Sequence, residues 1–354
     1  MDMSIKKELF GQVYDTPVYA YTMKNASHTS VRVMDFGGTL LNIWVADAAG
    51  HLDDVICGYD SPQGYINGGG YHGAIIGRCG NRIGNSTFTL DGTEYHLNSN
   101  EGKHHLHGGL RGYDRHFWQV DEAGTEDEPA LILSRISPDG EENYPGNLEI
   151  KVTYTLTAGG ALRIHYNAVT DKATPINLTN HAYFNLSGYQ RGNIGSHYLW
   201  MNADRINGID HELIPDGSIL PVDGTAYDFR ESRLLGEALS DPHPEIRFFD
   251  GFDNNFIFAD YDKTVRKQAT LKDPASGRVM HVYTDQPCMQ IYTCNIIAKD
   301  ALYFKSNVEP KKYFAICLET QAMPDSINHP GFTNVILRPG EVYDTTTVYE
   351  FVNE

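Results

Sequence analysis

The sequence has few cysteines, and they form no pattern. The five are scattered without a CxxC pair, at Cys57, Cys79, Cys288, Cys294 and Cys317. Such spacing indicates neither a zinc site nor a disulfide framework. It is typical of reduced thiols that serve as small buried apolar side chains in a cytoplasmic protein. We therefore expect a cytoplasmic protein whose core needs no cross-links.

Long apolar runs and an excess of positive charge are also absent. No stretch of about 18 apolar residues occurs, so no spanning helix is expected, and Met1–Phe10 lacks the apolar segment of a secretory signal. The chain has 28 lysines and arginines against 46 aspartates and glutamates, a net charge of −18. A surface this acidic repels phosphate backbones and anionic lipids. We expect neither nucleic acid nor membrane as a partner.

Three signatures of common enzyme classes are missing. The sequence has no G-x-G-x-x-G before a helix, no G-x-x-x-x-G-K-[ST] loop and no G-x-S-x-G elbow. These motifs mark dinucleotide binding, nucleoside triphosphate binding and the α/β-hydrolase nucleophile. Their absence disfavours nucleotide-dependent and α/β-hydrolase chemistry.

Strand periodicity dominates the chain. About twenty runs rich in β-branched and aromatic residues read as strands, the clearest being Val31–Phe36, Ala130–Ile136, Leu148–Leu156, Leu162–Val169 and Val342–Phe351. Asp91-Gly92 predicts a hairpin between Thr87–Leu90 and Thr93–Leu97. Only Glu231–Leu239 resembles a helix, and no 40–50-residue repeat suggests a propeller. The pattern predicts an all-β protein with very little helix, folded as one large antiparallel β-sandwich over residues 1–354.

Histidines gather in one short motif. The segment KHHLHGG (Lys103–Gly109) contains His104, His105 and His107. His-x-His on a strand places both rings on one face, as a metal site needs. The same residues also fit a hydrogen-bonding imidazole beside a glycine turn, or three solvated loop histidines. A second glycine-rich segment, Ser61–Gly73, reads as a functional loop or a long connection.

Polar residues crowd two further motifs. PINLTNHAYFNLSG (Pro175–Gly188) is too polar for an ordinary core strand, so it either lines a pocket or forms a structural polar network. His181 within it is an acid–base candidate because imidazole titrates near neutrality. In CLETQAMPDSINHP (Cys317–Pro330), Glu319 follows the apolar strand Tyr313–Leu318. It is either a general base whose pKa is raised by desolvation or a carboxylate that caps a strand end.

Two motifs carry groups that suit sugar recognition. Asp253 lies between aromatic residues in GFDNNF (Gly251–Phe256), and Arg78 and Arg82 flank Asn81 in GRCGNRI (Gly77–Ile83). Polar side chains beside aromatic rings can bind hydroxyl groups and the apolar face of a pyranose. Since an ordinary β core also contains many aromatic residues, these motifs alone do not settle the function.

Taken together, these motifs resemble the aldose 1-epimerase (galactose mutarotase) family over nearly the whole chain. The similarity begins at Val31–Tyr59 and continues in family order through GRCGNRI, LHGG, YPGNLEIKVTYTL (Tyr144–Leu156), NLTNHAYFNLSG, DGTAYDF (Asp223–Phe229), GFDNNF, QIYTCN (Gln290–Asn295), CLETQAMPDSINHP and LRPGEVY (Leu337–Tyr343). The resemblance implies a β-supersandwich that interconverts the α and β anomers of free hexoses such as galactose and glucose, without a cofactor or metal.

The resemblance also implies the roles of individual residues. Glu319 would be the general base and His181 the general acid. The substrate-binding residues would be Asn81, Arg82, His107, Tyr183, Asp253 and Gln290, whereas His104 and His105 would be ordinary loop residues. We expect Glu319 to rest as a carboxylate and His181 as an imidazolium, each favoured by the opposite charge. A monomer is expected, with a dimer as the alternative.

Three departures from the family pattern affect substrate preference more than chemistry. They are Asp35-Phe36-Gly37, Cys294 and Phe332-Thr333-Asn334. Other functions remain as alternatives. A glycoside hydrolase would pair Glu319 with Asp253 across the scissile bond, a sugar-binding module would lack the acid or base, and a hexose-phosphate epimerase would need extra basic residues.

Overall fold

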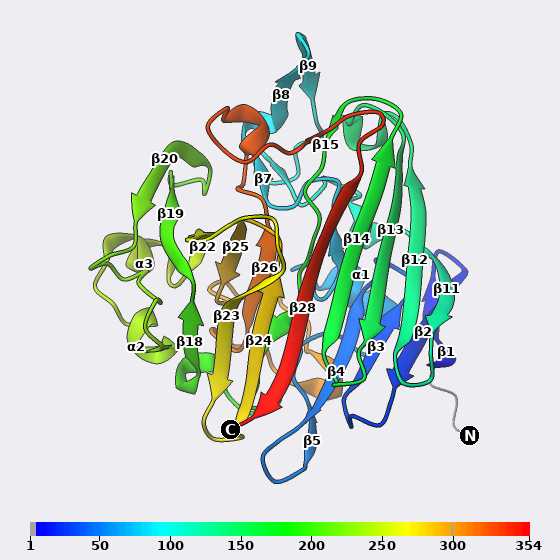
Figure 1. The fold of residues 1–354 in the computed structure, drawn as a ribbon, viewed down its shortest axis with the longest axis vertical. Helices are drawn as coiled ribbons and strands as arrows, with labels where there is room; N and C mark the ends of the chain where they lie inside the picture. Colours follow the sequence, from blue (N-terminus) through cyan, green and yellow to red (C-terminus); the bar gives the residue numbers. More distant parts are fainter. Residues whose placement is uncertain (1–4, 299) are drawn as a thin grey trace.

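The computed structural model describes residues 5–298 and 300–354, and antiparallel sheets dominate it. The largest sheet has nine strands, with β28 between β14 and β24 (Figure 1). Its order is β11 (Gln119–Gly124), β12 (Pro129–Ser137), β13 (Leu148–Leu156), β14 (Leu162–Thr170), β28 (Tyr343–Asn353), β24 (Arg278–Thr284), β23 (Arg266–Asp273), β18 (Tyr198–Met201) and β21 (Arg233–Leu234).

Two further sheets pack with the first. The six-stranded sheet has the order β17 (Tyr183–Phe184), β26 (Ile316–Gln321), β25 (Cys288–Tyr292), β22 (Asp253–Phe258), β19 (Ala203–Ile209) and β20 (Pro215–Pro221). The five-stranded sheet has the order β1 (Ile5–Val13), β2 (Thr16–Lys24), β3 (Ser30–Met34), β4 (Leu40–Ala46) and β5 (Leu52–Asp54). One cluster of buried apolar side chains includes residues of all three sheets, among them Val33, Val152 and Leu318.

Short strand pairs form separate two-stranded sheets. They are β7 (Arg82–Ile83) with β10 (His105–Leu106), β16 (Thr179–Asn180) with β6 (Ile75–Ile76), β15 (Thr174–Pro175) with β27 (Ile336–Leu337), and the projecting hairpin of β8 (Thr87–Leu90) and β9 (Thr93–His96) (Figure 1). Asp91 and Gly92 both have positive φ, as the predicted two-residue hairpin turn requires. Within the described residues, eight strands are only two residues long, too short for sequence alternation to reveal.

Helices are few and short, as expected. They are α1 (Pro62–Asn67), α2 (Leu235–Leu239) and α3 (Pro244–Phe249), with 3-10 turns at η1 (Gly84–Ser86), η2 (Tyr113–Arg115), η3 (Glu141–Asn143), η4 (Ile194–Ser196), η5 (Lys305–Asn307) and η6 (Ser326–Asn328). The predicted helix Glu231–Leu239 is correct only in its second half, because Arg233 and Leu234 pair with β18 as a strand. In the part of the chain described here, no helix has the length and apolar character needed to cross a bilayer.

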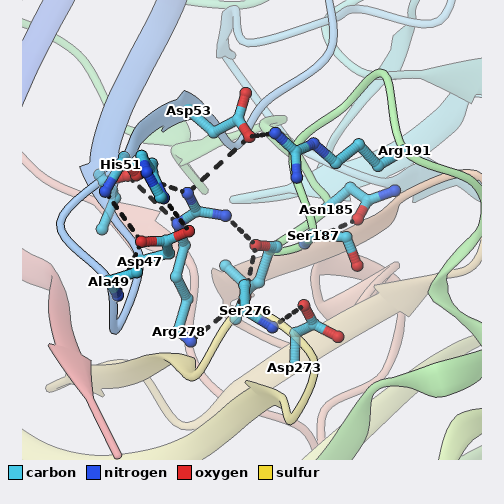
Figure 2. A network of polar contacts seen from close by, with 12 residues as sticks. Asp47, Ala49, His51, Asp53, Asn185, Ser187, Arg191, Asp273, Ser276 and Arg278 are labelled. Atoms are coloured by element: carbon cyan, nitrogen blue, oxygen red, sulfur yellow. Dashed lines mark hydrogen bonds and ion pairs between the residues drawn. The ribbon is translucent and has the colours of Figure 1, made fainter.

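A buried arginine holds the segment after β17 against two sheets. The guanidinium of Arg278 on β24 is almost fully buried and donates hydrogen bonds to the carbonyl oxygens of Val45 (3.1 Å), Leu186 (2.9 Å) and His51 (3.0 Å). Asp53 lies 3.9 Å from the same group (Figure 2). Carbonyl partners satisfy the buried donors, and the segment that follows Tyr183 is thereby fixed.

Candidate active site

Adjacent strands of the six-stranded sheet present polar side chains on one face. In the register of β22, β25 and β26, Asn255 pairs with Gln290, and Gln290 pairs with Glu319. Cross-strand partners share a face, and alternate residues point to opposite faces. The opposite face carries core residues such as Leu318. Glu319 therefore lies within β26 on a polar face, which corrects the expectation that it ends an apolar strand.

His181 faces Glu319 from the short segment between β16 and β17. Its Nε2 lies 3.6 Å from Glu319 Oε1, and its Nδ1 lies 3.5 Å from Cys317 Sγ. The imidazole stacks on Tyr183 (centroids 5.0 Å apart, 23° between planes) and on Tyr71 (6.0 Å, 28°). His181 is 4% exposed and Glu319 1%. The acid and base candidates of the sequence are thus neighbours in a buried environment.

His107 approaches His181 from the loop after β10. Their ring centroids are 5.1 Å apart. His107 Nδ1 accepts a hydrogen bond from the backbone N–H of Asn81 at 3.1 Å. A Cβ on Gly108 would lie 1.8 Å from the Gly77 carbonyl oxygen, and Gly108 has φ +91°. Only glycine permits this close approach, which explains why a glycine follows the histidine in LHGG.

The remaining predicted binding residues surround this centre. Gln290 Nε2 donates to Asp253 Oδ1 at 2.6 Å. Arg82 pairs in a bidentate manner with Glu101, with Nε–Oε2 and NH2–Oε1 distances of 2.6 and 2.8 Å. Asn81 Oδ1 accepts from the Arg82 backbone N–H. Bidentate pairing fixes the plane of a guanidinium, so Arg82 is held rigidly at this site.

Burial controls the protonation of the two central groups. Desolvation, with the nearby charge of Asp253, raises the pKa of Glu319 well above its ordinary value, although Arg82 opposes this. Desolvation lowers the pKa of His181 to about 4. Both shifts favour the uncharged form. This differs from the expected imidazolium–carboxylate pair, because desolvation is the largest influence on the pKa of each group. Moving one proton from Glu319 to His181 converts the neutral pair into the imidazolium–carboxylate pair at constant total charge.

Burial has similar effects on the neighbours. It lowers the pKa of His107 well below the ordinary value, assisted by His181 and Arg82. It raises the pKa of Asp253, opposed by the charge of Arg82 and by the hydrogen bond from Gln290. The guanidinium of Arg82 is the positive charge that offsets Asp253 and Glu101.

The cluster has the composition of a metal site but an unfavourable hydrogen-bond pattern. Ligand atoms of His107, His181 and Glu319 all lie within 4.8 Å of one another. A metal-ligating histidine normally donates its other ring N–H to an acceptor. Nδ1 of His107 instead accepts an N–H, which leaves the proton of neutral imidazole on Nε2. Binding a metal at Nε2 would require loss of that proton, so these residues fit a resident metal poorly.

Other motif residues are structural. Asn177, Asn180 and Asn185 bond to the backbone at Ala322, Gly73 and Phe314, so the polar strand of the sequence both lines the site and braces it. Arg78 is buried and donates to carbonyl oxygens at Pro145 and Gly146.

His104 and His105 are both buried, which contradicts the alternative of three solvated loop histidines. His105 is fully buried between the Asn98 carbonyl oxygen and the Tyr144 hydroxyl group, both 2.7 Å from its ring nitrogens. His104 is also buried, and its Nδ1 accepts the N–H of Asn85. Their neighbours along the chain are too polar to signal this burial.

Sequence reasoning missed three residues at the site. Tyr71 comes from the glycine-rich segment after α1, Glu101 holds Arg82, and Cys317 contacts His181. Tyr71 lies in the loop Ser61–Gly73, which the sequence indicates as a candidate functional loop. No local signal identifies Glu101, because its partner lies 19 residues away.

Comparisons with known proteins identify the family. The model of the family described as "Aldose 1-epimerase" matches residues 19–350. The chain belongs to the aldose 1-epimerase family. It is 44% identical to the galactose mutarotase of Homo sapiens, covering 91% of this chain and 90% of that one. It is 33% identical to the aldose 1-epimerase of Escherichia coli K12, covering 96% of each chain.

The fold agrees as well. The crystal structure of galactose 1-epimerase from Lactobacillus acidophilus superimposes with a TM-score of 0.87 at 27% identity, covering 99% of each chain. As an aldose 1-epimerase family member, the protein is an enzyme of the epimerase type that acts on free sugars. The predicted β-sandwich of the galactose mutarotase type is confirmed.

Proposed function

We propose that this enzyme is a mutarotase that interconverts the α and β anomers of free hexoses such as galactose and glucose. The observation that carries the proposal is the buried His181–Glu319 pair, with 3.6 Å between Nε2 and Oε1. Glu319 Oε2 is also buried, without a hydrogen-bond partner among the residues described. An unsatisfied buried carboxylate oxygen is costly, and a sugar hydroxyl group would satisfy it.

The two groups supply the two proton transfers that anomer exchange requires. Glu319 as carboxylate takes the proton from the C1 hydroxyl group, while Nε2–H of His181 gives a proton to the ring oxygen. The C1–O5 electron pair moves to O5 as the C1=O1 bond forms. Rotation about C1–C2 and reversal of these steps close the other anomer. The reaction needs no net redox change and no cofactor.

The surrounding residues would hold the sugar during this rotation. Asp253 and Gln290 are already hydrogen-bonded to each other, and Arg82 is fixed by Glu101. Asn81 positions His107 through its backbone N–H, and Tyr183 supports His181 by stacking. Such prior ordering lowers the entropic cost of holding a reactive geometry.

We also propose that residues 1–354 act as one domain, because a single apolar cluster includes both Ile5 and Phe351.

The hydrolase alternative has weaker support. It needs a second carboxyl group able to act as an acid or nucleophile beside Glu319. Asp253 is the candidate, and burial raises its pKa although Arg82 and the hydrogen bond from Gln290 oppose the shift. The ionisable group that pairs with Glu319, at 3.6 Å, is however His181 and not a second carboxyl group.

Polarimetry tests the proposal. The optical rotation of freshly dissolved α-D-galactose, and separately α-D-glucose, is followed with and without protein in the presence of EDTA. We expect faster approach to the same end point, lost in His181→Asn and Glu319→Gln. No acceleration of either sugar by folded wild-type protein would refute the proposal. Release of reducing sugar from an aryl glycoside would favour the hydrolase.

A further inference from the structure

Both ring nitrogens of His181 contact residues of one strand. Cys317 and Glu319 are two residues apart on β26, so they share a face of the sheet. Cys317 Sγ lies 3.5 Å from Nδ1, and Glu319 Oε1 lies 3.6 Å from Nε2. Strand β26 therefore contacts both ring nitrogens of His181, with Glu319 at Nε2 and Cys317 at Nδ1.

Stacking alone does not fix the orientation of the imidazole. The rings of Tyr71 and Tyr183 lie at 28° and 23° to the plane of the imidazole and restrain that plane by stacking. A rotation of 180° about χ2 leaves that plane unchanged but exchanges Nδ1 with Cδ2 and Nε2 with Cε1. The flipped ring would present carbon towards Glu319. A hydrogen-bonding partner at Nδ1 distinguishes the two orientations.

Cys317 is suited to this task because its thiol is inert. The side chain is fully buried, and burial together with the charge of Glu319 raises the pKa of the thiol well above its ordinary value. A protonated thiol both donates and accepts weak hydrogen bonds. It can accept a hydrogen bond from Nδ1–H, both in the imidazolium and in the neutral imidazole that remains when Nε2 gives up its proton. Other groups facing the ring are His107, Tyr71 and Tyr183.

We propose that Cys317 is a positioning residue, whose Sγ holds Nδ1 of His181 so that Nε2 alone exchanges protons with Glu319 and the sugar. This inference rests on the proposed mutarotase function. Cys317 itself takes part in no covalent or redox step.

Cys57 offers a matched control. It is also fully buried and belongs to the same small apolar cluster as Cys317, with Tyr183 and Cys294. Its thiol has no hydrogen bond to His181 among the contacts of the described residues. Cys57→Ala therefore removes the same atoms from the same cluster without touching the proposed contact.

The test compares Cys317→Ala, Cys317→Ser and Cys57→Ala by polarimetry and by ¹⁵N NMR of the His181 ring. We expect kcat of Cys317→Ala to fall by about tenfold with KM little changed, as a small loss of alignment would cause. Cys317→Ser should restore most of the rate, since its hydroxyl group can replace the thiol, and Cys57→Ala should keep the wild-type kcat. In Cys317→Ala the protonation pattern of Nδ1 and Nε2 should change.

Equal losses of kcat in Cys317→Ala and Cys57→Ala would overturn the inference, as would an unchanged ¹⁵N pattern of His181 in Cys317→Ala. If instead the proposed function is wrong, the wild-type protein will not accelerate anomer exchange. The NMR comparison would still decide whether Cys317 sets the protonation of His181, because it does not depend on turnover.

Discussion

Two buried acid–base pairs among the described residues differ in how completely their hydrogen-bonding groups are satisfied. Lys305 Nζ lies 2.6 Å from Asp54 Oδ2 and donates to the Leu41 carbonyl oxygen at 2.6 Å. Asp54 also accepts backbone N–H groups of Ile43 and Ile56. The His181–Glu319 pair is longer, at 3.6 Å, and leaves Glu319 Oε2 without a partner in the described part of the chain.

The difference separates structure from function. Hydrogen bonds to every charged atom make a buried pair a rigid part of the fold. The Lys305–Asp54 pair joins η5 to the five-stranded sheet, and its ammonium group and both of its carboxylate oxygens have partners. The His181–Glu319 pair retains unused hydrogen-bonding capacity in a buried site. A buried pair with an unpartnered polar atom is therefore a better indicator of an active site than an ion pair whose atoms all have partners.

The largest expected effect is on the rate of Glu319→Gln. Loss of the base should reduce kcat by about 10²–10⁴-fold, or about 3–5 kcal/mol of barrier. Burial raises the pKa of Glu319, so the folded state binds more protons than the unfolded state at neutral pH, which costs stability. The variant should therefore be at least as stable as the wild type in urea denaturation at pH 7. Clear destabilisation would show that Glu319 is structural.

Lys305→Met should show the opposite pattern. Removing one partner of a buried ion pair typically costs about 3–5 kcal/mol, because the other charge is left uncompensated. We expect the urea midpoint to fall accordingly, while the rate per folded molecule falls far less than in Glu319→Gln. The double variant Asp54→Asn/Lys305→Met, which removes both charges, should recover part of the stability. A fully stable Lys305→Met would contradict the comparison.

The pH dependence of kcat/KM should show a wide plateau. The active pair carries one mobile proton, and gain of a second proton defines the acid limb. With the pKa of His181 lowered to about 4 and that of Glu319 raised, the rate should fall only near pH 4 and stay level through neutrality. Polarimetry corrected for the uncatalysed rate measures this. An acid limb near 6.5 would show an imidazole with ordinary solvation and refute the proposed environment.

The smallest expected effect concerns His72, which stacks on Tyr183 with ring centroids 4.1 Å apart. Burial lowers its pKa to about 3, so the unfolded state binds more protons below about pH 6.5 and stability is lost as the pH falls. His72→Phe keeps an aromatic ring without titration. It should reduce the stability lost between pH 7 and pH 5 by about 1–2 kcal/mol in urea denaturation. An unchanged pH slope would contradict the assignment.

The sequence indicates the long strands, the hairpin at Asp91-Gly92 and the motifs that form the site. Alternation reveals β13 because each face meets a different environment along nine residues. It cannot reveal β16 or β17, because each of these strands has only two residues. The two strands nevertheless flank His181 and position it. Likewise, the burial of His105 and the pairing of Arg82 with Glu101 depend on contacts between segments. The protonation of Glu319 and His181 depends on desolvation, which only the packed structure reveals.

The most direct test observes anomer exchange at equilibrium. Saturation transfer between the α and β H1 resonances of galactose reports interconversion without any net reaction. The account predicts fast transfer with wild-type enzyme and with Lys305→Met at equal folded concentration, and transfer at the uncatalysed rate with Glu319→Gln. Fast transfer with folded Glu319→Gln would contradict the central role of the unsatisfied pair.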